Sequence, residues 1–189
     1  MDDRPIGIFD SGIGGISILN NLKDILPNEN FIYLADNKNC PYGSKTKKEI
    51  LLLSDKNCKK LIEFKCKIIV VACNTATTNS IQKLREIISI PIIGIEPGIK
   101  PAIKYTKTKN IGVLATENTL NSRLFFKTTN DNKIHDIKIH EQIGYELVNL
   151  IEEGSFSNNK LHQLLKSYLN PMINKNIDCL VLGCTHYHF

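Results

Sequence analysis

The sequence has 189 residues, of which 42% are hydrophobic and 23% are charged, and its formal net charge is +5. This balance is typical of a globular protein and excludes a disordered, collagen-like or coiled-coil chain. The positive charge comes from short lysine groups among asparagine and isoleucine. Because no basic stripe interleaved with aromatic residues appears, we expect no nucleic-acid partner.

Nothing at the N-terminus resembles a signal peptide, and no apolar run approaches the roughly 18 residues that span a bilayer. We therefore expect a cytoplasmic protein with no membrane partner. The six cysteines include no Cys-x-x-Cys pair. The chain is also too long for a small disulfide-stapled scaffold, so we predict free thiols and no structural zinc site.

Short apolar runs alternate with longer amphipathic segments through the first half of the chain. The runs 6–9, 31–35, 68–72 and 91–95 are predicted strands, and the segments 12–25, 47–64 and 77–88 are predicted helices. In the first helix we expect Ile13, Ile16, Leu19 and Leu22 to form one stripe. This alternating order indicates an α/β fold, with a parallel sheet and helices on both faces.

The second half repeats the plan of the first. Residues 111–116 resemble residues 6–11, and residues 179–185 resemble residues 69–74. The matched segments occur in the same order at similar separation. We therefore predict two pseudo-symmetric parallel-sheet domains, residues 1–96 and 97–189, with the active site in the cleft between them.

Polar residues follow four of the predicted strands. These turns are Asp10-Ser11-Gly12, Cys73-Asn74-Thr75, Thr116-Glu117-Asn118-Thr119 and Cys184-Thr185-His186. Because parallel sheets bind ligands at the carboxyl ends of their strands, we expect all four turns to point into one cleft if the halves face each other.

Cys73 is predicted at the start of a helix, with Asn74, Thr75 and Thr77 as candidate caps. The helix dipole and unpaired N–H groups there lower the pKa of a thiol, and they suit a substrate carboxylate. The alternative is a buried structural cysteine. Cys184 at the equivalent strand end weakens that alternative.

Two opposed thiols indicate a type of reaction. Inverting a stereocentre by proton transfer needs a base on one face and an acid on the other, and a thiolate and a thiol supply both. We expect Asp10 to assist Cys73 and to favour its thiolate, and His186 to assist Cys184. The alternatives are that Asp10 only caps the following helix and that His186 is a surface residue at a strand end.

Other motifs carry weaker signals. The glycine-rich segment 10–15 lacks the Gly-x-Gly-x-x-Gly spacing and the P-loop ending, so it predicts a strand-to-helix turn better than a nucleotide site. The turn at 39–43 is either an ordinary surface turn or a substrate-contacting loop. Cys58, Cys66 and Cys179 lie within or beside regular elements, and we interpret them as structural.

Six segments together resemble the glutamate racemases of the aspartate/glutamate racemase superfamily. They are 6–15 (IGIFDSGIGG), 33–43 (YLADNKNCPYG), 69–79 (IVVACNTATTN), 94–102 (GIEPGIKPA), 113–120 (VLATENTL) and 182–187 (LGCTHY). They cover nearly the whole chain in the family's order. The resemblance implies an isomerase that interconverts L- and D-glutamate without pyridoxal phosphate, metal or nucleotide. It also implies a supply of D-glutamate for peptidoglycan, and often a homodimer.

The resemblance also implies roles for individual residues. Cys73 and Cys184 would be the two catalytic acid/base groups. Asp10 would support the first thiol, and His186 and Glu152 the second, with Glu153 as the alternative to Glu152. The implied substrate-binding residues are Asp10, Ser11, Pro41, Tyr42, Gly43, Cys73, Asn74, Thr75, Thr119, Cys184, Thr185 and His186.

The sequence departs from the family in two respects. The stretch 143–146 lacks the family's usual Cys-Pro pair, and the sequence stops at Phe189, where family members continue with elements that return to the first domain. We therefore expect exposed apolar surface on the first domain. The alternatives to a glutamate racemase are a racemase for another acidic amino acid such as aspartate, and a catalytically inactive racemase-fold protein that binds an acidic ligand or partner. Cys-Asn-Thr together with Cys-Thr-His favours glutamate.

Overall fold

The computed structural model describes residues 2–130, 136–155 and 159–189. The chain divides into two compact units, Met1–Glu96 and Pro97–Phe189. Each unit contains one parallel sheet with helices, which confirms the predicted α/β class with two parallel sheets. Among the described helices, none is both long and apolar enough to cross a membrane.

The first unit is built on a four-stranded parallel sheet with the order β2-β1-β3-β4. Its elements are β1 (Ile6–Asp10), α1 (Ile16–Ile25), β2 (Phe31–Ala35), the 3-10 helix η1 (Asn37–Asn39), α2 (Lys47–Glu63), β3 (Ile68–Val71), α3 (Asn74–Ile87) and β4 (Ile92–Gly94).

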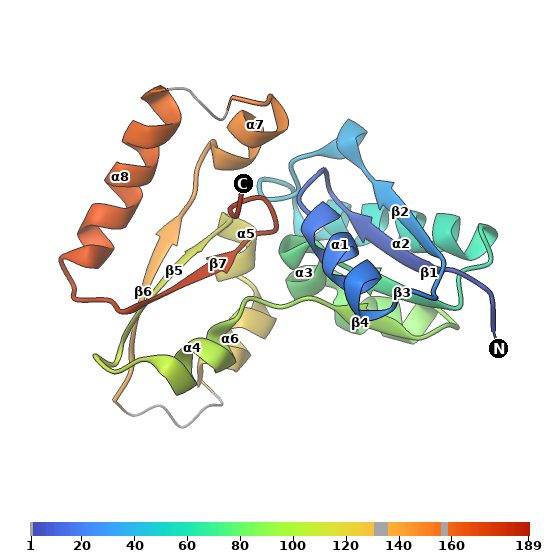
Figure 1. Ribbon diagram of the computed structural model, residues 1–189, viewed down its shortest axis with the longest axis horizontal. Helices are drawn as coiled ribbons and strands as arrows, with labels where there is room; N and C mark the ends of the chain where they lie inside the picture. Colours follow the sequence, from blue (N-terminus) through green and yellow to red (C-terminus); the bar gives the residue numbers. More distant parts are fainter. Residues whose placement is uncertain (1, 131–135, 156–158) are drawn as a thin grey trace. The chain divides into compact units, whose positions relative to one another are not determined.

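Helices cover both faces of this sheet (Figure 1). On one face Ile8 of β1 packs with Leu19 and Leu22 of α1. On the other face a Cβ added at Gly7 would lie 3.1 Å from Leu61 of α2, so helix and strand approach closely there. The predicted α1 stripe is wrong at Ile16, which is 39% exposed. The helix starts only at that residue, so the periodicity taken from the preceding turn does not apply.

The sheet face beneath α1 is incompletely covered. Phe31 and Ile68 are partly buried against the core of that face, and Ile93 of β4 is 48% exposed. Ile8 and Val70 point toward α1, so the residues that follow and precede them, Phe9 and Ile69, point to the opposite face. Both Phe9 and Ile69 are fully buried there. Apolar surface is therefore open on one side of the first unit.

The second unit has a three-stranded parallel sheet with the order β6-β5-β7. Its elements are α4 (Ile99–Tyr105), β5 (Asn110–Ala115), α5 (Glu117–Leu120), α6 (Arg123–Asn130), β6 (Lys138–Ile143), α7 (Leu147–Glu152), α8 (Asn159–Ile173) and β7 (Cys179–Gly183).

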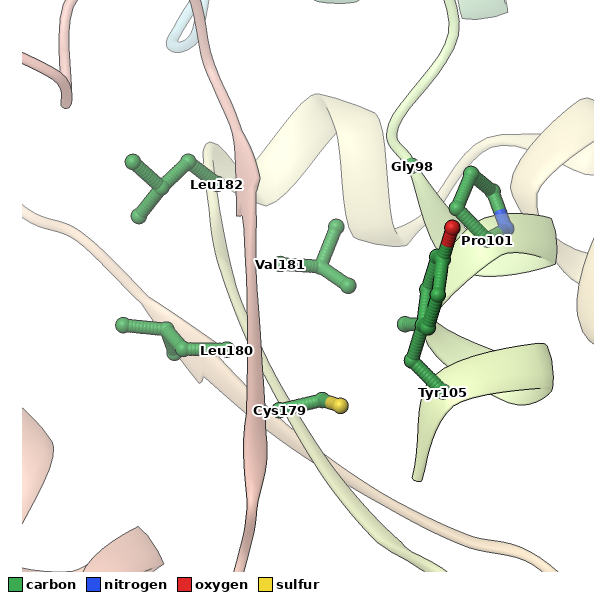
Figure 2. Close-up of a pocket in the computed structure, with 8 residues that line it drawn as sticks. Gly98, Pro101, Tyr105, Cys179, Leu180, Val181 and Leu182 are labelled. Carbon is green, nitrogen blue, oxygen red and sulfur yellow. The ribbon is translucent and has the colours of Figure 1, made fainter.

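Different helices pack on the two faces of the second sheet. Val113 of β5 packs in one core with Ile99 of α4 and Phe125 of α6. On the opposite face a Cβ added at Gly112 would lie 3.1 Å from Met172 of α8. Figure 2 shows Val181 of the edge strand β7 pointing toward α4, where it lines an apolar groove. The groove residues include none of the predicted site residues.

Strands β1 and β5 are inner strands of their sheets, and they are the two segments whose sequences resemble each other. Strand β3 lies next to β1 and strand β7 lies next to β5, and each of the two is followed by a cysteine of the candidate site. Cys73 and Cys184 therefore follow equivalent strands of their own sheets, and both thiols are buried.

Candidate functional site

Cys73 lies at the carboxyl end of β3 and is the N-cap residue of α3. Its Sγ accepts a hydrogen bond from the Ala76 backbone N–H at 3.4 Å. The thiol lies 3.6 Å from Ser11 Oγ, to which it donates. The structure therefore brings together Cys73 and the Asp10-Ser11 turn that follows the neighbouring strand β1.

The residues predicted to cap α3 have other partners. Asn74 Nδ2 donates to the Ile95 carbonyl at 3.0 Å, and Thr77 Oγ1 donates to the Val71 carbonyl at 3.1 Å. The predicted caps are therefore wrong at these two positions, because the cysteine sulfur itself occupies the capping position.

The pKa of the Cys73 thiol is raised from 9.0 to about 12, first by burial and then by the negative charge of Asp10. Hydrogen bonds from Ala76 and Ser11 lower it, but they do not compensate for desolvation. The predicted lowering of this pKa is wrong, and so is the expectation that the Asp10 charge favours the thiolate. The raised pKa favours the protonated thiol.

Asp10 is fully buried, and its Oδ1 accepts from the Gly12 backbone N–H at 3.0 Å. It does not cap α1, whose N-cap is Gly15. A Cβ added at Gly15 would lie 2.8 Å from the Asp10 Cβ and 2.9 Å from Tyr33 Oη. The glycine-rich turn is thus explained by close packing around Asp10 and needs no phosphate ligand.

The turn that contains Pro41, Tyr42 and Gly43 is anchored to the interior. Tyr42 is only 1% exposed. Its hydroxyl donates to Asp36 Oδ2 at 2.5 Å and accepts from Asn57 Nδ2 at 3.0 Å. Burial, together with the negative charges of Asp36 and of an ionised Cys73, raises the pKa of Tyr42. The turn is therefore more than a surface connection.

Sequence reasoning missed Asp36 and Asn57. Asp36 follows β2 directly, and its backbone N–H donates to the Asp10 carbonyl at 3.0 Å. A signal was present, since Asp10 was selected because it follows a predicted strand in the same way. Asn57 lies within the amphipathic pattern of α2 and had no such signal.

In the second unit Cys184 directly follows β7, and its Sγ lies 3.7 Å from His186 Nδ1. His186 Nε2 lies 2.5 Å from Glu152 Oε1, at the end of α7. His186 is only 1% exposed, so its interpretation as a surface histidine is wrong. Glu153 is exposed at the C-cap of the helix, and the carboxylate next to His186 is Glu152.

The remaining predicted contacts of the second unit are buried hydroxyl groups. Thr119 Oγ1 lies 2.9 Å from the Thr116 Oγ1, and Thr119 is fully buried. Thr116 is the N-cap of α5, and Thr185 is 7% exposed. Thr116 and Thr119 follow β5, the latter within α5, and Thr185 lies in the turn after β7. These are the carboxyl ends of the strands, where sequence reasoning expected ligand contacts.

Comparison with known proteins identifies this arrangement. The family model described as Asp/Glu/Hydantoin racemase matches residues 16–188. The chain belongs to the Asp/Glu/Hydantoin racemase family. The resemblance that the six motifs indicate is thereby confirmed.

Similar members of this racemase family are called glutamate racemases. The one from Ralstonia pickettii is 45% identical over 185 residues, which make up 98% of this chain and 65% of that relative. The Bacillus anthracis RacE1 structure superposes with a TM-score of 0.89 at 36% identity, covering 99% of this chain and 70% of the other. The Francisella tularensis racemase, solved in complex with D-glutamate, has a TM-score of 0.85 at 37% identity, covering 99% and 70%.

This racemase-family chain thus spans about two thirds of the length of its relatives. Within that length each unit has one buried cysteine at the carboxyl end of an equivalent strand. One thiol lies beside a hydroxyl and a buried carboxylate, and the other beside a histidine–carboxylate pair. Both environments are suited to proton transfer.

Proposed function

We propose that the chain carries the catalytic groups of a glutamate racemase, which interconverts L- and D-glutamate by proton transfer between two cysteines and the substrate Cα. The observation that carries the proposal is the pair of equivalent strand ends, each with a buried thiol and a partner for its proton. Similarity to glutamate racemases along the whole chain supports glutamate as the substrate.

In the proposed reaction one thiolate removes the α-proton, and the other thiol donates a proton to the opposite face of the resulting carbanion. In the substrate-free state Cys73 is the donor, because its raised pKa favours the protonated form. Cys184 is the base, since His186 lies beside its sulfur to accept the thiol proton and Glu152 stabilises the imidazolium. The roles exchange for the opposite enantiomer.

The substrate is held by groups at the strand ends. In the proposal Asp10, Ser11, Asn74 and Thr75, with the Pro41–Gly43 turn, contact the substrate in the first unit. Thr119, Thr185 and His186 do so in the second. The D-glutamate product would serve peptidoglycan synthesis in the cytoplasm, and a homodimer remains a prediction from the resemblance.

A racemisation assay tests the proposal. The 189-residue chain is incubated with L-glutamate and no added cofactor, and the loss of optical rotation is followed by circular dichroism. We expect turnover that falls by roughly 10²–10⁴-fold in Cys73→Ser and in Cys184→Ser, the usual contribution of a general acid or base. Cys179→Ser, in the apolar groove, is the matched control and should keep its activity.

A second candidate is an inactive racemase-fold protein that binds an acidic ligand. The raised pKa of Cys73 favours it, because a thiol with a pKa of about 12 is scarcely present as the thiolate base near neutral pH. Under this alternative the folded chain would not racemise glutamate, but glutamate would still slow the alkylation of Cys73.

Turnover of aspartate in preference to glutamate would instead favour a racemase for another acidic amino acid.

A further inference from the structure

We propose that Asp36 is a positioning residue of the candidate site: through the Tyr42 hydroxyl it fixes the turn at 41–43 at the carboxyl end of β1. The inference rests on the proposed function, because that proposal makes the turn a substrate contact. It adds a carboxylate that neither the motifs nor the family resemblance singles out.

Three contacts tie Asp36 to η1, to the turn and to the neighbouring strand. Its backbone N–H donates to the Asp10 carbonyl at 3.0 Å. Its Oδ1 accepts from Asn39 Nδ2 at 2.8 Å, and its Oδ2 accepts from the Tyr42 hydroxyl at 2.5 Å. Asp36 thus connects three elements: its backbone N–H bonds the carboxyl end of β1, and its side chain bonds η1 and the turn.

The hydroxyl of Tyr42 is held in one orientation by this network. Its proton is donated to Asp36, and Asn57 Nδ2 from α2 donates to its oxygen at 3.0 Å. Asn57 also lies 3.4 Å from Asp36 Oδ2. Because Tyr42 is buried and charge-assisted hydrogen bonds are the stronger kind, the ring is held tightly.

The turn is tied to the strand end beside the one that carries the reactive thiol, because the Asp36 N–H donates to the Asp10 carbonyl of β1 at 3.0 Å and β1 pairs with β3. An ionised Cys73 contributes less than burial and Asp36 to the raised pKa of Tyr42. Because the Tyr42 hydroxyl donates its hydrogen bond to Asp36, it does not compete as a donor to the Cys73 sulfur. Asp36 therefore positions the turn while leaving Cys73 with its bonds to Ser11 and Ala76.

The test is the separation of KM from kcat in Asp36→Asn, a nearly isosteric change. We expect KM for glutamate to rise roughly 10-fold, the loss expected for one charged hydrogen bond, with kcat changed less than KM. Tyr42→Phe should give the same pattern, and the double variant should be no worse than Tyr42→Phe, because both remove one interaction. Asp24→Asn, an exposed aspartate of α1, is the matched control and should behave as wild type.

A second readout does not depend on turnover. The concentration of glutamate that halves the alkylation rate of Cys73, mapped by mass spectrometry, should rise in Asp36→Asn as KM does. Unchanged KM and unchanged protection in a folded Asp36→Asn would overturn the inference and leave the proposed function intact. A wild-type chain with neither turnover nor protection would overturn both. If Asp36→Asn does not fold, Tyr42→Phe decides, because it keeps the buried ring.

Discussion

His186 and Glu152 are 34 positions apart in the sequence, yet the imidazole Nε2 lies 2.5 Å from the carboxylate Oε1. The bond fixes the ring so that its other nitrogen, Nδ1, lies 3.7 Å from Cys184 Sγ. Thiol, imidazole and carboxylate are connected in series, so the imidazole can take the thiol proton and the carboxylate can stabilise the resulting charge.

Glu152→Gln tests the contact between the carboxylate and the imidazole. The amide can hold the ring but cannot stabilise an imidazolium, so we expect kcat to fall on the order of 10-fold, less than the loss of a direct acid or base. Glu153→Gln changes the exposed neighbouring carboxylate and should leave kcat at the wild-type value. Equal effects of the two substitutions would show that His186 is not paired with Glu152 in solution.

Asp10→Asn tests the electrostatics of Cys73. The Asp10 charge raises the pKa of this thiol, so its removal should lower the pKa from about 12. The amide oxygen retains an acceptor for the Gly12 N–H. The alkylation rate of Cys73 against pH gives the midpoint, which we expect to move downward. An upward movement would mean that Asp10 stabilises the thiolate.

The buried thiols predict a loss of stability in alkaline solution. The pKa values of Cys58 and Cys73 are both raised from 9.0 to about 12 in the folded protein. Above pH 9 the unfolded chain releases these protons and the folded chain retains them, so stability falls between about pH 9 and 12. Thermal unfolding followed from pH 8 upward should show this decline. Cys58→Ala should have a lower melting temperature but a shallower decline.

The capping box of α2 tests the start of the helix that carries Asn57. The Thr46 side chain accepts from the Glu49 N–H, and the Glu49 carboxylate accepts from the Thr46 N–H at 2.8 Å. Thr46→Ala should lower the free energy of unfolding by about 1 kcal/mol, whereas Thr46→Ser keeps the cap and should lose far less. Urea denaturation measures both, and equal losses would contradict the cap.

The elements that sequence reasoning predicted best are those with continuous apolar runs. Strands β1 and β3 are buried or half-buried, mostly apolar runs, whereas Leu180 and Leu182 of the apolar run β7 are exposed. A polar residue or a cysteine stands at or just after the end of each strand. Strand β6 was missed because it is an edge strand that mixes lysine, histidine and glutamate, so it has no apolar run. Helix α8 was missed as well, and it contains Pro171, which ordinarily argues against a helix interior.

The pKa values and hydrogen-bond partners of the site residues depend on burial, and the order of residues in the sequence does not show which side chains are buried. Cys73 at a helix N-terminus predicted a lowered pKa, but desolvation by packing reversed the sign. Tyr42 looked like a turn residue, and its contacts with Asp36 and Asn57 depend on how the turn packs onto α2. The position of these residues at the strand ends could be predicted from motifs, whereas the protonation and partners of their side chains required the packed structure.

The central claim is that two separate thiols act on one glutamate, and solvent isotope incorporation tests it most directly. When racemisation is run in deuterated water and stopped early, the product from either enantiomer should carry deuterium at Cα, because the donating thiol exchanges with solvent before each turnover. Product that retains the substrate's protium at Cα in both directions would mean that a single group removes and returns the proton, and would contradict the account.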